Sequence, residues 1–168
     1  MSLEEALEAI RSFHARSPYE RFWYVVFSVR PYPASPSQAL ATGLSDLAPI
    51  RISLPDLLYE RYGDRWERLL AAEQKGQLSE FAPALEHALK RALEATHPGS
   101  LVILSGLEIL RLIPLNLTAL VLPLARERTV LAVLKGTLTR GGVRVLGVEP
   151  ELPSPPNLRP PLTVEVEP

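Results

Sequence analysis

The chain has 168 residues, enough for one domain with a hydrophobic core, and a formal net charge of −1. The balanced charge excludes a general electrostatic attraction to nucleic acid or to an anionic membrane surface. The absence of cysteine excludes disulfides, thiolate zinc sites and thiol nucleophiles.

The N-terminal third alternates between predicted helix and predicted strand. Ser2 and Glu5 have the spacing of a capping box, which predicts a helix from Ser2 that ends before Pro18. The aromatic and β-branched residues 21–29 predict a buried strand, because they contain no turn residue and prolines follow them. Residues 37–47 predict a short helix.

The middle of the chain adds a second strand and more helices. Residues 50–53 predict a strand, and Ser53 then starts a helix in which proline and aspartate occupy the first turn. Gly63 is expected to end that helix, Asp64 to begin the next one, and residues 79–95 to form another. The remaining predicted elements are a third strand at 101–104, helical segments at 107–112 and 115–122, a fourth strand at 129–134, a hairpin-like loop at 136–142 and a fifth strand at 143–148.

The strands centred on Val25, Ile103 and Leu131 are continuous apolar runs rather than alternating ones. Strands of this kind are buried on both faces and belong to parallel sheets covered by helices. The sequence therefore predicts a three-layer α/β domain over residues 1–148, with a mostly parallel sheet of about five strands. Its outline is P-loop-like or Rossmann-like but lacks a Walker motif.

Residues 149–168 are rich in proline, and we expect them to form an extended C-terminal arm. Within the arm, residues 162–167 alternate between apolar and polar side chains. Three alternatives remain open for this stretch: an edge strand on the chain's own sheet, an edge strand on a partner, or a frayed tail.

No segment predicts membrane insertion or export. The longest uncharged apolar stretch, residues 112–125, has 14 residues and two prolines, whereas a membrane span needs roughly 20 apolar residues. The acidic N-terminus does not resemble a signal peptide. We expect a cytoplasmic protein, and the many prolines with few thermolabile side chains indicate a thermophile.

The turn at Ser105 and Gly106 follows a buried strand and precedes a helical segment, as a phosphate-binding loop would. A phosphate-binding loop needs several glycines and a lysine, but this turn has one glycine and is followed by Glu108. We interpret it as a tight turn into a packing helix. A degenerate nucleotide-binding domain remains the alternative.

Catalytic and metal-binding patterns are missing from the sequence. No two of His14, His87 and His97 have metal-ligand spacing, so we expect them to be structural or solvated. No serine has an obvious histidine or acid partner. We expect no metal and no cofactor, and a non-enzymatic role more than an enzymatic one.

In open α/β sheets, ligands bind beyond the carboxyl ends of the strands. Those ends are predicted to carry Arg30, Ser53, Ser105 with Gly106, and Lys135 with Gly136 and Thr137. Arg126 and Arg128, before the fourth strand, are expected at an exposed helix end. A solvated hairpin tip or a partner-binding loop can explain the region after the fourth strand. The candidate partner-binding residues are Lys135, Gly136, Thr137, Arg140, Gly141 and Gly142.

Three stretches carry a resemblance to a known family. They are FWYVVFSVRP, LAPIRISLPDLLYERYG and LVILSGLEILRLIPLNLTALVLPLARERTVLAVLKGTLTRGGVRVLG. In order of elements over residues 20–147, the chain resembles the BrxB family of bacteriophage-exclusion (BREX) defence systems. Where that family has a Tyr-Pro-Gly-x-Tyr turn, this chain has Leu134 to Leu138, so only Gly136 carries over, and Gly141 or Gly142 corresponds to a later loop glycine.

The resemblance implies a small accessory protein that acts with other components of its defence system, particularly a PglZ-type protein. It implies no catalytic residue that can be transferred to this chain. The leading hypothesis is therefore a non-enzymatic adaptor that binds a PglZ-type partner. The alternatives are a degenerate, ATPase-like nucleotide-binding domain and a nucleic-acid-binding subunit, although contact with nucleic acid is expected only indirectly, through the complex.

Overall fold

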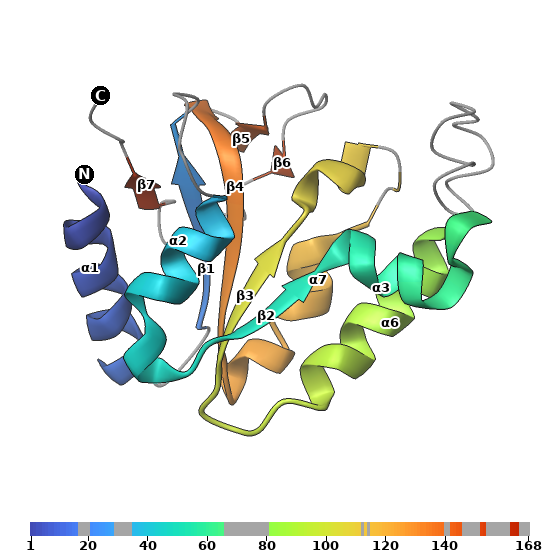
Figure 1. The fold of residues 1–168 in the computed structure, drawn as a ribbon, viewed down its shortest axis with the longest axis horizontal. Coiled ribbons are helices and arrows are strands. Elements are labelled where there is room, and N and C mark those ends of the chain that lie inside the picture. The colour runs from blue at the N-terminus through green and yellow to red at the C-terminus, as the bar shows by residue number, and fades with distance from the viewer. Residues whose placement is uncertain are drawn as a thin grey trace.

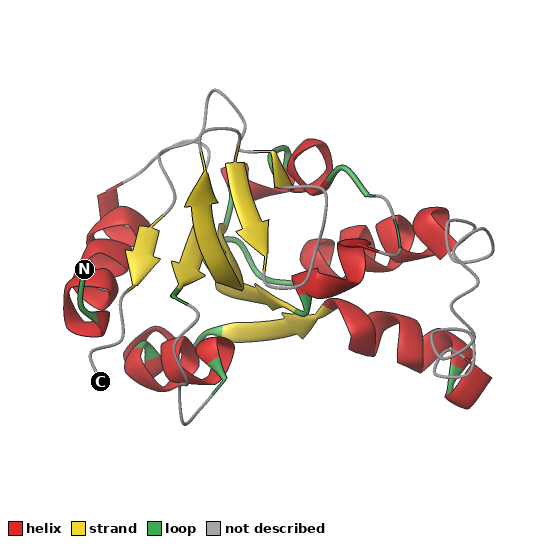
Figure 2. Cartoon of the chain, turned by 90° about the horizontal axis from the view of Figure 1, so that it is seen from above, coloured by secondary structure: helices red, strands yellow, loops and turns green. Residues whose placement is uncertain are grey.

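The structure is a computed structural model, and it describes residues 1–16, 21–28, 35–65, 81–111, 113, 115–139, 142–145, 152–153 and 162–164. Over these residues the chain is a three-layer α/β domain, which confirms the predicted fold class. A mostly parallel sheet lies between two groups of helices (Figures 1 and 2). None of the helices in these ranges combines the length and apolar character needed to cross a membrane.

The described elements follow the predicted order, with five α-helices and three short 3-10 helices interleaved with strands. The helices are α1 (Leu3–Arg16), α2 (Pro36–Gly43), α3 (Leu54–Tyr62), α6 (Ala82–Glu94) and α7 (Leu117–Val121), with 3-10 helices η1 (Ser45–Leu47), η3 (Leu107–Arg111) and η4 (Leu124–Arg126). The strands are β1 (Phe22–Phe27), β2 (Ile50–Ser53), β3 (Leu101–Ser105), β4 (Thr129–Thr139), β5 (Gly142–Val145), β6 (Leu152–Pro153) and β7 (Leu162–Val164).

The parallel strands lie in the order β2-β3-β4-β1-β7. Strand β1 pairs with β4 along its whole length, from Phe22 opposite Val130 to Phe27 opposite Lys135. Strand β7, from the proline-rich segment, pairs in parallel with the other edge of β1. Of the three alternatives for this stretch, the edge strand on the chain's own sheet is the one observed for residues 162–164.

One face of the sheet is covered by α1 and α2. The side chains of β1 alternate, so that Trp23, Val25 and Phe27 join the cluster beneath these two helices. Phe13 of α1 contacts Trp23, with ring centroids 4.9 Å apart. The other residues of this cluster are Ala6, Ile10, Leu40, Leu44, Leu101, Ile103, Leu131, Val133 and Val164.

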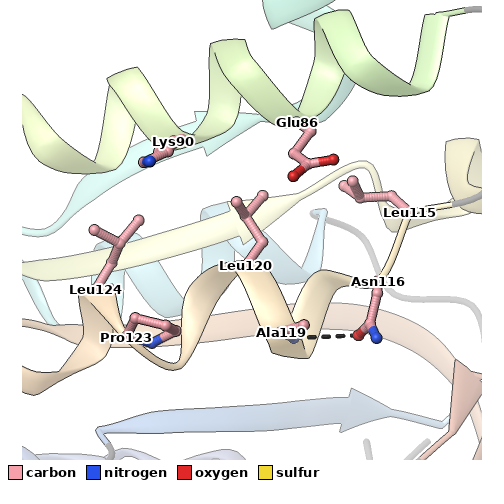
Figure 3. A pocket seen from close by; sticks show the side chains of 8 residues that line it. All are labelled: Glu86, Lys90, Leu115, Asn116, Ala119, Leu120, Pro123 and Leu124. Atoms are coloured by element: carbon pink, nitrogen blue, oxygen red, sulfur yellow. Dashed lines mark hydrogen bonds between the residues drawn. The ribbon is translucent and has the colours of Figure 1, made fainter.

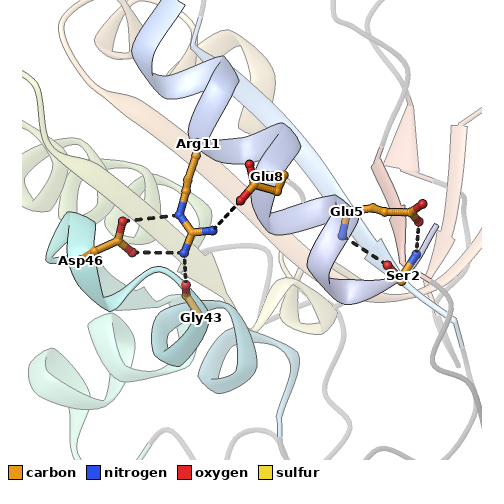
Figure 4. A network of polar contacts seen from close by, with 6 residues as sticks. All are labelled: Ser2, Glu5, Glu8, Arg11, Gly43 and Asp46. Atoms are coloured by element: carbon orange, nitrogen blue, oxygen red, sulfur yellow. Dashed lines mark hydrogen bonds and ion pairs between the residues drawn. The ribbon is translucent and has the colours of Figure 1, made fainter.

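A polar network on the surface joins α1 to the end of α2 (Figure 4). Arg11 of α1 donates to the carbonyl oxygen of Gly43 at 2.7 Å and forms an ion pair with Asp46 at 3.3 Å. The hydrogen bond and charge of Arg11 hold the pKa of Asp46 below its usual range. At the start of α1, Ser2 and Glu5 exchange the two hydrogen bonds of the predicted capping box.

The opposite face is covered by α3, α6, η3, α7 and η4. The fully buried leucines of this layer recur at helical spacing, for example Leu85, Leu89 and Leu93 of α6. They pack on Phe22, Tyr24 and the alternate residues of the neighbouring strands. The helices of the two layers therefore bury both faces of β1, β3 and β4, as the continuous apolar runs predict.

Arg128 contradicts the prediction of an exposed helix end, because it is only 5% exposed. Its guanidinium donates to the carbonyl oxygens of Leu124 at 2.9 Å and Thr96 at 3.3 Å. Its Nε has no hydrogen-bond partner among the described residues. Through these hydrogen bonds the buried side chain links the residue pair that follows α6 to the residues just before β4. Arg126, in contrast, is exposed as predicted.

One further prediction was wrong. Residues 136–139 are not a loop, because β4 continues to Thr139 and pairs with β5 in antiparallel register. The helical segment predicted from residue 107 is observed as a 3-10 helix over Leu107–Arg111. The body of the helix predicted from Asp64, the end of the first predicted strand and residues 146–148 lie outside the described residues.

Candidate functional site

A pocket lies at the carboxyl end of β3 and beside the middle of β4, where the parallel pairing of β4 with β1 ends, against the first turn of α2. We call it the strand-end pocket, and its volume is about 320 Å³. It forms because the chain leaves β1 toward one face of the sheet and β3 toward the other, which opens a crevice between the two connections. Its lining residues are Ser35, Pro36, Ser37, Ser105, Gly106, Glu108, Val133, Leu134 and Lys135.

The first turn of α2 supplies ordered polar groups. The Ser35 hydroxyl caps the helix by accepting from the Gln38 amide at 3.2 Å. Ser37 is 7% exposed, and its hydroxyl accepts from the Arg51 guanidinium at 3.1 Å. Arg51 also donates to the Gln38 side chain at 2.6 Å, so two contacts join β2 to the first turn of α2.

The turn at Ser105 and Gly106 does not form a phosphate-binding loop. Gly106 has a φ of +75°, and a Cβ built on it would lie 2.3 Å from Cδ of Pro55. The missing side chain therefore allows the turn to pack against the first turn of α3, rather than allowing a phosphate to approach the backbone. This packing agrees with the interpretation of a tight turn into a packing helix.

The candidate partner-binding residues divide between two places. Lys135 lies in the strand-end pocket, together with Ser105 and Gly106 from the next strand. Gly136 and Thr137 continue β4, and Gly142 begins β5 opposite Thr139. Arg140 and Gly141 lie outside the described residues. Ser53 ends β2, opposite Ser105.

The serines of α2 were not among the predicted site residues, although the sequence contains a signal for them. A serine followed by proline, serine and glutamine is a typical helix start, with the cap at Ser35 rather than Ser37. The strand order determines that this helix start lies beside β3 and β4. No local pattern encodes the strand order.

The histidines do not assemble a catalytic group. His14 Nδ1 lies 2.6 Å from the hydroxyl of Thr129, and burial together with the positive charge of Arg21 lowers the pKa of His14. His87 and His97 are exposed. In the described part of the chain, no three His, Cys, Asp or Glu side chains come close enough together to hold a metal ion.

A second pocket, the α6–α7 groove, has a volume of about 300 Å³ (Figure 3). Glu86 and Lys90 of α6 lie across it from Leu120 and Leu124. Asn116 closes one end, where its side chain caps α7 by accepting from the Ala119 amide at 3.1 Å. This groove is more apolar than the strand-end pocket, and its lining carries one carboxylate, Glu86, and one cation, Lys90.

The comparisons with known proteins give no relative from which a site could be transferred. No protein-family model, no curated protein and no solved structure matches this chain.

Proposed function

We propose that the protein is a non-enzymatic accessory subunit of a BREX-type phage-defence system, and that it binds a PglZ-type partner protein in the cytoplasm. The proposal follows the sequence resemblance to the BrxB family. The elements β1, β2 with α3, β3, η3, β4 and β5 follow one another in the order on which that resemblance depends.

The observation that carries the proposal is the antiparallel extension of the sheet. Strand β4 continues past the end of β1 and pairs with β5, which in turn pairs with β6. These strands lie together at the carboxyl end of the parallel sheet (Figure 1). A paired hairpin held on a rigid sheet is a suitable contact surface for a partner, because little order has to be gained on binding.

Co-expression with the PglZ-type protein encoded beside this chain tests the proposal. We expect a stoichiometric complex that survives size-exclusion chromatography at micromolar concentration. The variant Arg140→Glu, at the connection between β4 and β5, is expected to weaken the complex by roughly tenfold or more, because charge reversal at an interface is costly.

Arg126→Glu is the matched control, because Arg126 is exposed and precedes β4 at the other end of the strand. It should leave the complex intact. A chain that elutes alone in the presence of its neighbour-encoded partner would exclude the proposal. Equal weakening by both substitutions would exclude the hairpin as the contact surface.

A further inference from the structure

The strand-end pocket has a chemistry that partner binding does not require. We propose that it binds a small phosphorylated metabolite, with the phosphoryl group beside Lys135 and a hydroxyl group of the ligand beside Glu108. This inference is independent of the adaptor function, since it concerns a cavity in the domain rather than the hairpin.

The dimensions and place of the pocket limit the ligand. A volume of about 320 Å³ is at the small end of the range for metabolite sites. The pocket also lies where connections leave the sheet toward opposite faces, the position at which open α/β sheets bind ligands. These properties suit a molecule of the size of a sugar phosphate.

The lysine in the pocket lining indicates an anion. No carboxylate of the described residues forms an ion pair with Lys135, so its ammonium group is available to a ligand. A charged donor of this kind makes a stronger hydrogen bond to a phosphoryl oxygen than a neutral donor does.

Besides Lys135, the first turn of α2 offers one backbone hydrogen-bond donor to a ligand. Pro36 has no N–H, and the amides of Gln38 and Ala39 already donate to the hydroxyl and the carbonyl oxygen of Ser35. The N–H of Ser37 has no acceptor among the described residues, so it is the donor left for a ligand.

Glu108 determines what kind of phosphorylated molecule fits. Its carboxylate is exposed on η3 and lines the same pocket, where it would repel a second phosphate. The same oxygens accept hydrogen bonds from hydroxyl groups. A monophosphate that carries hydroxyl groups therefore suits the pocket better than a polyphosphate or a bare phosphate ion.

Calorimetric titration of the full chain with ribose 5-phosphate, inorganic phosphate and ribose tests the inference. We expect saturable binding of ribose 5-phosphate, at least tenfold tighter than binding of either fragment. Lys135→Gln should weaken that binding at least tenfold, and Lys135→Arg should retain it. Lys90→Gln removes the lysine of the α6–α7 groove and should change nothing.

Three outcomes would overturn the inference. They are no saturable binding of ribose 5-phosphate at about 10 mM, equal affinity for inorganic phosphate, and equal effects of the substitutions at Lys135 and Lys90. Thermal unfolding of each variant confirms that it is folded before titration. Because none of these variants changes Arg140, loss of the partner complex and loss of ligand binding are separate results.

Discussion

Gly106 shows how one residue fixes the packing of two elements. Its positive φ ends β3 in a tight turn, and its lack of a side chain lets Pro55 of α3 approach. Gly99 also has a positive φ, +84°, but a Cβ there would meet no atom within 4 Å. The two glycines therefore differ in packing while sharing a backbone conformation that L-residues adopt at a cost.

Gly106→Ala should lower the free energy of unfolding by about 3 kcal/mol, because backbone strain of about 1 kcal/mol adds to a clash of about 2 kcal/mol with the proline ring. Gly99→Ala should lower it by only about 1 kcal/mol. Urea unfolding of both variants measures the difference. Equal losses would contradict the close contact between the turn and α3.

His14 gives the molecule a dependence on pH. Its pKa is lowered in the folded chain by burial and by Arg21, whereas an unfolded histidine titrates near about 6.5. Between these two pKa values the unfolded chain binds more protons than the folded chain, so stability rises with pH in this window. The contribution of His14 is fully present above about pH 6.5 and is lost as the pH falls through the lowered pKa.

His14→Asn should therefore reduce the difference in unfolding free energy between pH 7 and pH 5. Urea unfolding at the two pH values measures this difference. His87→Asn is the control, because His87 is exposed and should leave the difference as it is in the wild type. A pH dependence unaffected by His14→Asn would show that His14 does not contribute to it.

At the scale of elements, Arg128 joins three of them. It donates to a carbonyl at the end of α6 and to one in η4, and it lies directly before β4. Arg128→Met removes the donors but keeps much of the volume, which leaves two carbonyl oxygens without their partners. The expected loss is about 2 to 3 kcal/mol of unfolding free energy.

Arg126→Met is the matched control for this prediction. Arg126 is exposed two residues earlier, so its replacement should change stability by less than about 0.5 kcal/mol. Thermal unfolding of the two variants side by side gives the comparison. A loss of the same small size in both would show that the bonds of Arg128 contribute little net stability.

The sequence predicts elements well where the pattern is local. Continuous apolar runs identified β1, β3 and the first half of β4, and the capping box identified α1. The second half of β4 was missed because glycine and lysine at 135–136 weaken the strand pattern, whereas pairing with β5 supplies the hydrogen bonds. The same limit applies to the pocket. The sequence predicted that Lys135 and Ser105 follow strands, but it did not predict that α2 lies beside them, because the position of α2 depends on the strand order.

At the scale of the whole molecule, β7 closes an edge of the sheet. It covers β1 on the side away from β4, and its Val164 is fully buried beneath α1 and α2. Without it, β1 would present an open edge of aromatic and β-branched residues, which is a template for pairing with other chains.

Truncation after residue 161 should therefore destabilise the domain by several kcal/mol and promote self-association, because one strand pairing and the burial of Val164 are lost. Truncation after Val164 keeps β7 and serves as the control. Urea unfolding and light scattering measure the two effects. A monomer of unchanged stability after truncation at residue 161 would show that β7 does not protect the edge.

The strand order also has a consequence for synthesis of the chain. Strand β1, whose six residues are all buried, emerges early, but both of its neighbours, β4 and β7, lie more than a hundred residues later. A nascent chain must therefore carry the stretch FWYVVF unpaired until most of the domain has been made. Contacts so distant in sequence slow folding, and such a stretch promotes aggregation while it is exposed. Rapid translation or high expression should make this protein depend on chaperones that shield β1.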